Sequence, residues 1–178
     1  MLRDYTRLIV FAVGLLGGVQ VPGFVDQYAK RVSAHYLEAQ RAFSGFQATA
    51  DEHFKGSVPD LVAHHLASGD RVFVDEAKTI ETLQHRLASL ATEAASMNGS
   101  LLKQIIHVAI AADRELLAET TASYSYTVPL APRAIFCGIA VAFASAMLVE
   151  GLLLAVLRGL TAGFRGKGRS PVVSQRSM

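Results

Sequence analysis

The chain has 178 residues, of which 51% are hydrophobic and 18% charged, and its formal net charge is +2. Soluble domains contain about 25% charged residues, so this composition is apolar for a soluble protein. The basic residues form no dense run interleaved with aromatic side chains, which argues against a nucleic-acid-binding protein. The single cysteine, Cys137, excludes an intrachain disulfide framework.

The first of two apolar blocks covers residues 8–25 and reads LIVFAVGLLGGVQVPGFV. Its length is close to the ~20 residues that a membrane-spanning helix needs. Residues 1–7 carry arginines, as the start of a signal peptide does, but no small-x-small cleavage site follows the block. We therefore predict an uncleaved transmembrane helix, which Pro22-Gly23 should kink where it leaves the membrane.

Residues 26–133 are predicted to form a helical domain outside the membrane. Apolar residues at helical spacing over 25–54 predict a long helix that ends at Lys55-Gly56. A second long helix is predicted over 73–97, where apolar residues alternate steps of three and four. Because each apolar stripe needs cover, we expect these two helices to pack as an antiparallel hairpin.

Short helices are predicted between and after the long ones. The first covers 59–67 and has Ser57 or Asp60 as its candidate N-cap. Another is expected over 101–112. Asp113 should cap a last short helix, because its carboxylate can accept hydrogen bonds from free amides in the first turn.

The second apolar block covers residues 134–157 and contains one charged residue, Glu150. Pro129 and Pro132 precede it, where proline suits the start of a helix. We predict a second transmembrane helix here. Residues 158–178 are basic and rich in Gly and Ser, so we expect a disordered tail that can bind anionic lipid headgroups. The predicted class is thus an all-α membrane protein with two transmembrane helices that flank an extramembrane helical hairpin.

Basic residues flank both predicted spans on their outer sides. They are Arg3, Arg7, Arg158, Arg165, Lys167 and Arg169. Short basic flanks stay in the cytoplasm according to the positive-inside rule. We therefore predict cytoplasmic termini, and in a bacterium the central domain would be periplasmic.

Glu150 is the most conspicuous candidate for a functional residue. A charged residue at the centre of a spanning helix costs roughly 2.5–3.5 kcal/mol on insertion scales. Either Glu150 is neutralised in place, or it serves as a partner contact or an ion relay. Gly138, Ala142 and Ala146 precede it at steps of four. Small residues on one face allow another helix to approach closely, so this face is a candidate intramembrane contact.

Gly14 and Gly18 form a GxxxG pair in the first block, which suits either self-association or packing between the two spans. Counting depths from the flanking arginines of two antiparallel spans, we predict that Glu150 lies near Gly14 to Gly18. The same count places Gln20 near Ser145, at hydrogen-bonding distance.

The sequence contains no recognisable catalytic, cofactor or metal motif. Six histidines occur, at positions 35, 53, 64, 65, 85 and 107. No two of them have the i,i+4 spacing common in helical metal sites, so we interpret them as solvated surface residues. No phosphate-binding glycine loop and no GxSxG sequence occurs. We therefore predict a protein that is not an enzyme and that needs no cofactor.

Four strings in order give the chain a resemblance to a known family. They are Gly23–Tyr28, Gly45–Gln47, Asp113–Leu117 and Thr127–Leu130. Together they resemble domain-of-unknown-function family 2937, over about residues 1–160. The resemblance implies a small proteobacterial inner-membrane protein that retains its first segment, and it brings no catalytic residues.

Three functions remain open from the sequence. The first is a non-enzymatic accessory or scaffold subunit that binds a membrane or periplasmic protein partner, or a second copy of itself. The second is a periplasmic ligand sensor, which would need a separate output protein because the tail is too short for a domain. The third is an oligomeric channel or transporter component in which Glu150 handles an ion.

Overall fold

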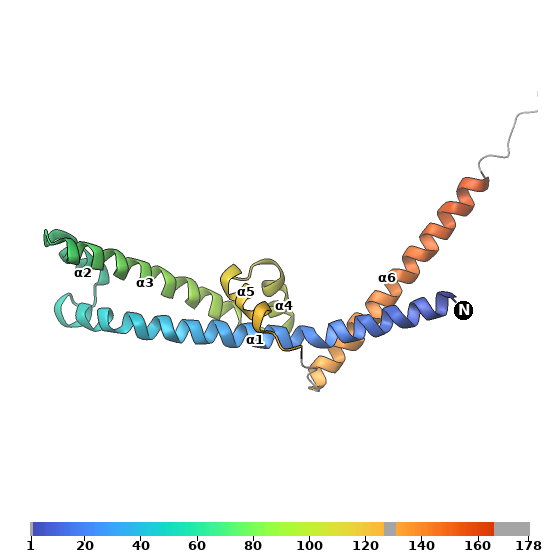
Figure 1. Ribbon diagram of the computed structural model, residues 1–178, viewed down its shortest axis with the longest axis horizontal. Helices are drawn as coiled ribbons and strands as arrows, with labels where there is room; N and C mark the ends of the chain where they lie inside the picture. Colours follow the sequence, from blue (N-terminus) through green and yellow to red (C-terminus); the bar gives the residue numbers. More distant parts are fainter. Residues whose placement is uncertain (1, 127–130, 166–178) are drawn as a thin grey trace, which may run out of the picture. The chain divides into compact units, whose positions relative to one another are not determined.

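The computed structural model describes residues 2–126 and 131–165 (Figure 1). These residues form six α-helices and no strand, so the predicted all-α class is correct. The helices are α1 (Leu2–His53), α2 (Val58–Ala67), α3 (Arg71–Ser96), α4 (Leu101–Ile110), α5 (Arg114–Ser123) and α6 (Pro132–Arg165). They divide into two compact units. The helix pair contains residues 2–20 and α6, and the hairpin unit contains residues 21–126.

In the hairpin unit, α3 lies alongside the second part of α1, and α2 lies at the turn between them (Figure 1). Apolar side chains from the three helices meet at this end. This tip cluster consists of Phe43, Ala50, Val58, Leu61, Val62, Ala77 and Ile80. The predicted stripes on the two long helices therefore supply the contact between them.

The turn at the tip is built from local signals that the sequence displays. Lys55 and Gly56 have positive φ angles of 54° and 84°, a region that glycine enters without strain. The Gly56 N–H donates to the carbonyl of Ala50 at 2.9 Å. Ser57 then caps α2, since its hydroxyl accepts from the N–H of Asp60 at 3.3 Å. Both the helix end and one of the two candidate caps are as predicted.

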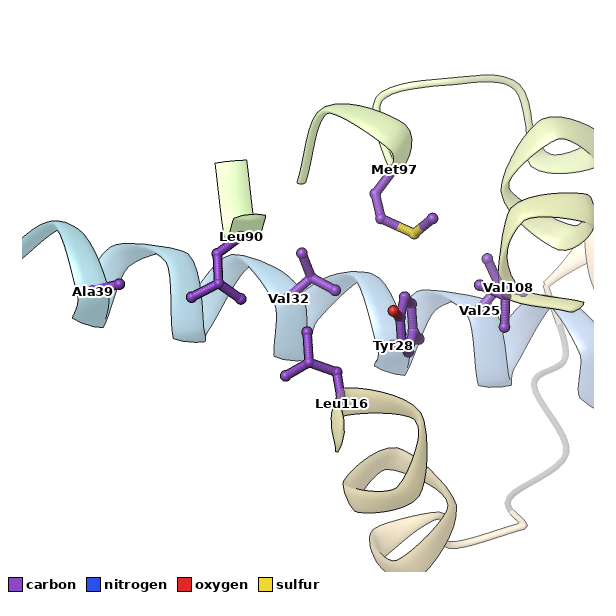
Figure 2. Packing of buried hydrophobic residues seen from close by; sticks show 8 residues of the cluster. All are labelled: Val25, Tyr28, Val32, Ala39, Leu90, Met97, Val108 and Leu116. Carbon is purple, nitrogen blue, oxygen red and sulfur yellow. The ribbon is translucent and has the colours of Figure 1, made fainter. Parts of the chain in front are cut away.

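At the other end of the hairpin, α4 and α5 pack against α1 and the end of α3. The base cluster consists of Val25, Tyr28, Val32, Ala39, Leu90, Met97, Val108 and Leu116, all labelled in Figure 2. Asp113 caps α5 as predicted, because its carboxylate accepts from the N–H groups of Glu115 at 2.9 Å and Leu116 at 3.0 Å. The short helices thus complete the core around the first turns of α1 in this unit.

The last helix differs from the sequence-based expectation at its end. It begins at Pro132 and continues to Arg165, whereas we predicted an end at residue 157 and a disordered tail from 158. The remaining predicted tail, 166–178, lies outside the described residues, as does Pro129. Near the other terminus, α1 continues through Pro22-Gly23 without an interruption of the helix.

Two helices, α1 and α6, are long and apolar enough to cross a membrane, judged by length and composition. The most apolar 18-residue windows of both reach a mean hydropathy of 2.1. Only 22% and 17% of the residues in these two windows are buried. Their apolar character is therefore not explained by burial within the chain.

Candidate functional site

The glycines predicted to mediate helix contact lie where α1 meets α6 in the helix pair. A Cβ atom at Gly18 would lie 2.9 Å from the Cα of Gly138 and 3.1 Å from the carbonyl oxygen of Cys137. A Cβ atom at Gly14 would lie 3.1 Å from the Cα of Ala142. Because these obstacles are backbone atoms, a larger residue would push the helices apart.

The contacting face of α6 carries the small residues that we singled out. A Cβ atom at Gly138 would overlap the Val19 side chain and lie 3.0 Å from the carbonyl oxygen of Leu15. Ala142 and Ala146 are both buried. The structure therefore brings Gly14, Gly18 and these α6 residues to one close contact. Whether that contact carries a function stays a prediction.

Glu150 lies at a different level from the predicted one. Its Oε2 atom is 3.7 Å from the Arg7 Nη1 atom, so Glu150 lies beside the start of α1 and not between Gly14 and Gly18. The prediction counted depths from Arg158 as the end of the helix. In the structure α6 continues past Arg158 to Arg165, so Arg158 is not a reference point for depth. The observed register is that of the glycine contacts, with Gly18 against Gly138 and Gly14 against Ala142.

Ser145 is shifted in the same direction. It lies against Gly14, and its hydroxyl donates to the carbonyl of Ala142 at 3.0 Å. Gln20 follows Gly14 by six residues, or about 9 Å along a helix. The geometry thus places Ser145 opposite a glycine and satisfies its hydroxyl within its own helix, instead of pairing it with Gln20.

A pocket of about 410 Å³ opens at the tip of the hairpin unit. Its lining is mainly apolar and aromatic, with three histidines. The lining residues are Thr49, His53, Phe54, Leu61, His64, His65, Ser68 and Phe73. Such volumes fall within the ~300–1,000 Å³ typical of ligand sites. No sequence motif predicts this pocket, because its walls come from the end of α1, from α2 and from the start of α3.

His65 is the most tightly held histidine in the pocket wall. Its Nδ1–H donates to the carbonyl of Leu61 at 2.9 Å, and its Nε2 atom lies 3.5 Å from the Glu76 Oε2 atom. Its ring packs edge-on against Phe73 with a centroid distance of 5.4 Å. The first hydrogen bond requires a proton on Nδ1, because a carbonyl oxygen can only accept, and it fixes the orientation of the ring.

Away from the pocket, a group of polar side chains lies beside the base cluster and includes its member Tyr28. The buried Tyr28 hydroxyl donates to Glu93 Oε1 at 2.5 Å and accepts from the Asp113 N–H at 3.0 Å. His107 Nε2 is 2.7 Å from the same Glu93 oxygen. Burial, followed by the hydrogen bond to Glu93, raises the pKa of Tyr28 above its usual range. This network joins α1, α3, α4 and the cap of α5.

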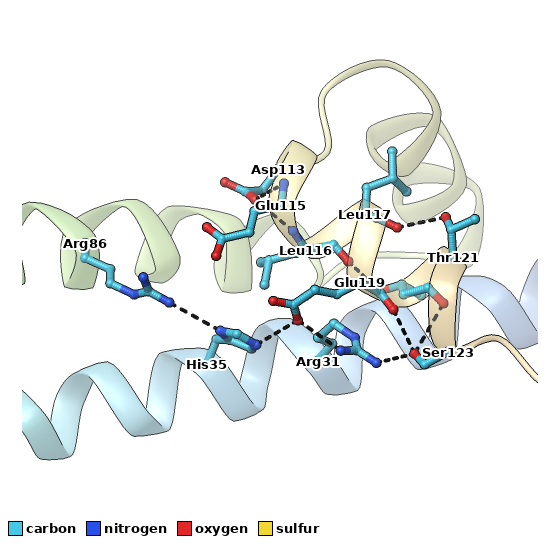
Figure 3. Close-up of polar contacts among 11 residues, drawn as sticks. Arg31, His35, Arg86, Asp113, Glu115, Leu116, Leu117, Glu119, Thr121 and Ser123 are labelled. Carbon is cyan, nitrogen blue, oxygen red and sulfur yellow. Dashed lines mark hydrogen bonds and ion pairs between the residues drawn. The ribbon is translucent and has the colours of Figure 1, made fainter.

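Glu119 joins α5 to α1 in a second group, shown in Figure 3. Arg31 Nη1 donates to Glu119 Oε2 at 2.9 Å, and His35 Nε2 lies 3.1 Å from that oxygen. Arg86 Nη2 approaches His35 Nδ1 at 3.5 Å. The hydrogen bond from Arg31 is the main cause of the lowered pKa of Glu119. The electrostatic interaction with His35 and the hydrogen bond to it lower this pKa further.

Three histidines therefore differ from the solvated surface residues that we expected. His35, His65 and His107 are mostly buried and face carboxylates of other helices. The sequence gives no sign of these pairs, because Glu119 and Glu93 lie 84 and 14 residues away from His35 and His107. Among residues 2–126 and 131–165, no three His, Cys, Asp or Glu side chains converge as metal ligands would.

Comparison with known proteins identifies a family but no function. No curated protein and no solved structure matches the chain significantly. A family model described as "Protein of unknown function (DUF2937)" matches residues 2–161, which is most of the chain and includes all six helices except the end of α6. The chain therefore belongs to the DUF2937 family.

Proposed function

We propose that the chain is a non-enzymatic, membrane-anchored accessory protein whose helical hairpin presents its tip to a protein partner. The observation that carries this proposal is the apolar pocket at the tip, beside further exposed apolar side chains. Leu66 and Val72 lie close in sequence to the pocket residue Phe73, and all three are exposed. Exposed apolar patches on otherwise polar domains commonly mark interaction sites.

The membrane anchor is supported by the outward faces of the helix pair. Large apolar side chains cover these faces and are exposed to whatever surrounds the chain: Leu8, Ile9, Val13, Leu16, Phe136, Phe143, Met147 and Leu148. Contact between the two helices uses small residues instead, as is typical of helices packed in lipid. In a bilayer, apolar lipid chains would surround these side chains, whereas in water the same side chains would be exposed to a polar solvent.

The proposed orientation follows from the basic flanks. Arg3 and Arg7 before the first span, and the basic residues from Arg158 onward, favour cytoplasmic termini. With both termini on that side, the hairpin unit lies on the other side of the membrane. In a proteobacterium this arrangement puts the chain in the inner membrane with a periplasmic hairpin.

A ligand sensor is the second candidate, and the same pocket favours it. Its volume suits a small, largely apolar molecule, and His65 offers a polar group with a fixed orientation. A sensor would pass the signal to a separate protein. Calorimetric or spectroscopic binding of a small molecule to the purified chain, lost in Phe73→Ala, would favour the sensor over the accessory protein.

An ion-handling role for Glu150 has less support. Arg7 lies 3.7 Å from its carboxylate, and a carboxylate paired with an arginine is better suited to neutralising charge than to relaying ions. Replacement by glutamine decides the matter. Loss of an ion flux in reconstituted vesicles with Glu150→Gln, at unchanged protein stability, would support the channel.

The proposed function is tested by purifying the full chain from its native membrane in mild detergent, together with its partners. Phe73→Ala removes a ring from the pocket, and Leu37→Ala is the matched control, since these residues are 45% and 46% exposed. We expect a partner protein with the wild type and the Leu37 variant and its depletion with the Phe73 variant. Recovery of the isolated chain alone under several detergents, or equal recovery with both variants, would contradict the proposal.

A further inference from the structure

Helix α4 has apolar side chains on two of its faces, and only one face is covered. Leu101, Ile105 and Val108 pack in or against the base cluster. The opposite face carries Leu102, Ile106 and Ile110, which are 66%, 49% and 81% exposed. These three residues recur at steps of four, so they form one continuous apolar stripe along the helix. An exposed apolar stripe of this kind is typical of a helix that contacts something outside its own domain.

The place where α4 is attached indicates what the stripe contacts. Val108 belongs to the base cluster together with Val25 and Tyr28 (Figure 2). Val25 is the last residue of the first apolar block, and Tyr28 follows it by about one helical turn. The hydrogen bond from the Asp113 N–H to the Tyr28 hydroxyl fastens the end of the α4 segment to the same turn. Helix α4 is therefore held at the level where α1 leaves its apolar block.

Aromatic side chains gather at the same level. Phe24 packs edge-on against Tyr124 with a centroid distance of 5.3 Å, and Tyr124 packs in the same way against Tyr126 at 5.1 Å. Tyr126 is largely exposed. Tyrosines are enriched where membrane-spanning segments meet the headgroup region, because their rings are apolar and their hydroxyls are polar. The composition of this aromatic group is typical of an interface between membrane and water.

We propose that α4 is an interfacial helix, and that Leu102, Ile106 and Ile110 insert into the boundary between headgroups and acyl chains of the leaflet from which α1 emerges. The proposal rests on the membrane placement proposed above and adds a third lipid contact to the two spans. Lys103, exposed on α4, can extend its ammonium group toward lipid phosphates while its stem lies on apolar surface. The contact would hold the hairpin unit against the membrane surface and fix its tilt.

The sequence makes a direct test possible because the chain contains no tryptophan. Single-tryptophan variants of the full chain are reconstituted in phosphatidylcholine and phosphatidylglycerol vesicles, with or without bromine on the acyl chains. Ile110→Trp probes the stripe, and Leu102→Trp repeats the probe at its other end. Val72→Trp is the control, since Val72 is a 72% exposed apolar residue at the hairpin tip. Leu16→Trp reports on the span itself.

We expect bromines deep in the bilayer to quench Leu16→Trp strongly. Bromines near the headgroups should quench Ile110→Trp several-fold more strongly than Val72→Trp. The tryptophan emission of Ile110→Trp should also be shifted to the blue. Quenching of Ile110→Trp and Leu102→Trp no stronger than that of Val72→Trp would overturn the proposal. A blue shift without lipid quenching would overturn it too, because the stripe would then be covered by protein, such as a second copy. If Leu16→Trp is not quenched either, the membrane placement itself fails, which distinguishes the two failures.

Discussion

The helix pair and the hairpin unit use the same long helix, α1, in opposite ways. In the helix pair, contact is made at Gly14 and Gly18, where the backbone of α6 comes within van der Waals distance. In the hairpin unit, α1 instead contributes large buried side chains such as Tyr28 and Phe43. The outer faces are reversed as well: the helix pair exposes large apolar side chains, and most of the hairpin unit exposes polar ones.

The two kinds of contact are those expected of a helix that passes from lipid into water, as proposed above. In water, burial of large side chains stabilises a contact by roughly 25 cal/mol per Å² of apolar surface. In lipid that driving force is missing, and close backbone packing between small residues takes its place. The change from one pattern to the other within a single helix supports the proposed boundary near Val25.

Ile80→Ala should have the largest effect and should disrupt the hairpin unit. Ile80 is fully buried in the tip cluster, and truncation of such a residue costs about 2–5 kcal/mol. Thermal unfolding of the full chain in detergent, followed by circular dichroism, should show a clearly lower midpoint. Val72→Ala is the control on the same helix, and its exposed side chain should leave the midpoint nearly unchanged. Equal midpoints for both variants would mean that the tip cluster contributes little.

Gly18→Ala should disrupt the helix pair. Its new methyl group meets backbone atoms of α6 at 2.9 and 3.1 Å, and overpacking of this kind costs roughly 1–3 kcal/mol. The rate of alkylation of Cys137, the single cysteine, should rise several-fold in detergent as the helices separate. Gly17→Ala is the matched control, because nothing lies within 4 Å of a Cβ atom there. A faster rate in both variants would point to a general loosening instead of a glycine contact.

Glu119→Gln should lower the stability of the hairpin unit in a pH-dependent way. The folded-state pKa of Glu119 is lowered, chiefly by Arg31, so the carboxylate stabilises the fold above the usual glutamate pKa. This stabilisation is lost as the pH falls through the lowered pKa. Unfolding midpoints of wild type and variant should therefore differ at neutral pH and converge in acid. Glu38→Gln, at an exposed position of α1, is the control. An equal pH dependence of the unfolding midpoint in Glu119→Gln and wild type would refute the proposed stabilisation by the Glu119 carboxylate.

Arg7→Gln should have the smallest effect, and it tests whether the ion pair with Glu150 holds the helix pair together. The Arg7 side chain is largely exposed and its guanidinium is 3.7 Å from Glu150, and exposed ion pairs contribute about 0–1 kcal/mol. The alkylation rate of Cys137 should stay close to that of the wild type. A larger change than in Gly18→Ala would show that the ion pair, and not the small-residue face, holds the two helices together.

The elements whose signals are local could be predicted from the sequence. The stop at Lys55-Gly56, the Ser57 cap and the Asp113 cap involve atoms a few residues apart. The apolar stripes on α1 and α3 are equally readable, because helical periodicity is a property of consecutive residues. The choice of small residues for the helix-pair face could be inferred in the same way. These features depend on the backbone near each residue and not on how the helices are placed.

Other features could not be predicted, because they depend on which distant residues meet in the folded chain. The register between α1 and α6 is that of the close contacts of Gly18 with Gly138 and of Gly14 with Ala142, and it places Glu150 beside Arg7 and Ser145 beside Gly14. The hydrogen bonds from Arg31 to Glu119 and from Tyr28 to Glu93 join residues 88 and 65 positions apart. The pocket and the exposed stripe of α4 exist only because packing covers one apolar face and leaves another open. Periodicity reveals that a face is apolar, but only the assembled helices determine what it contacts.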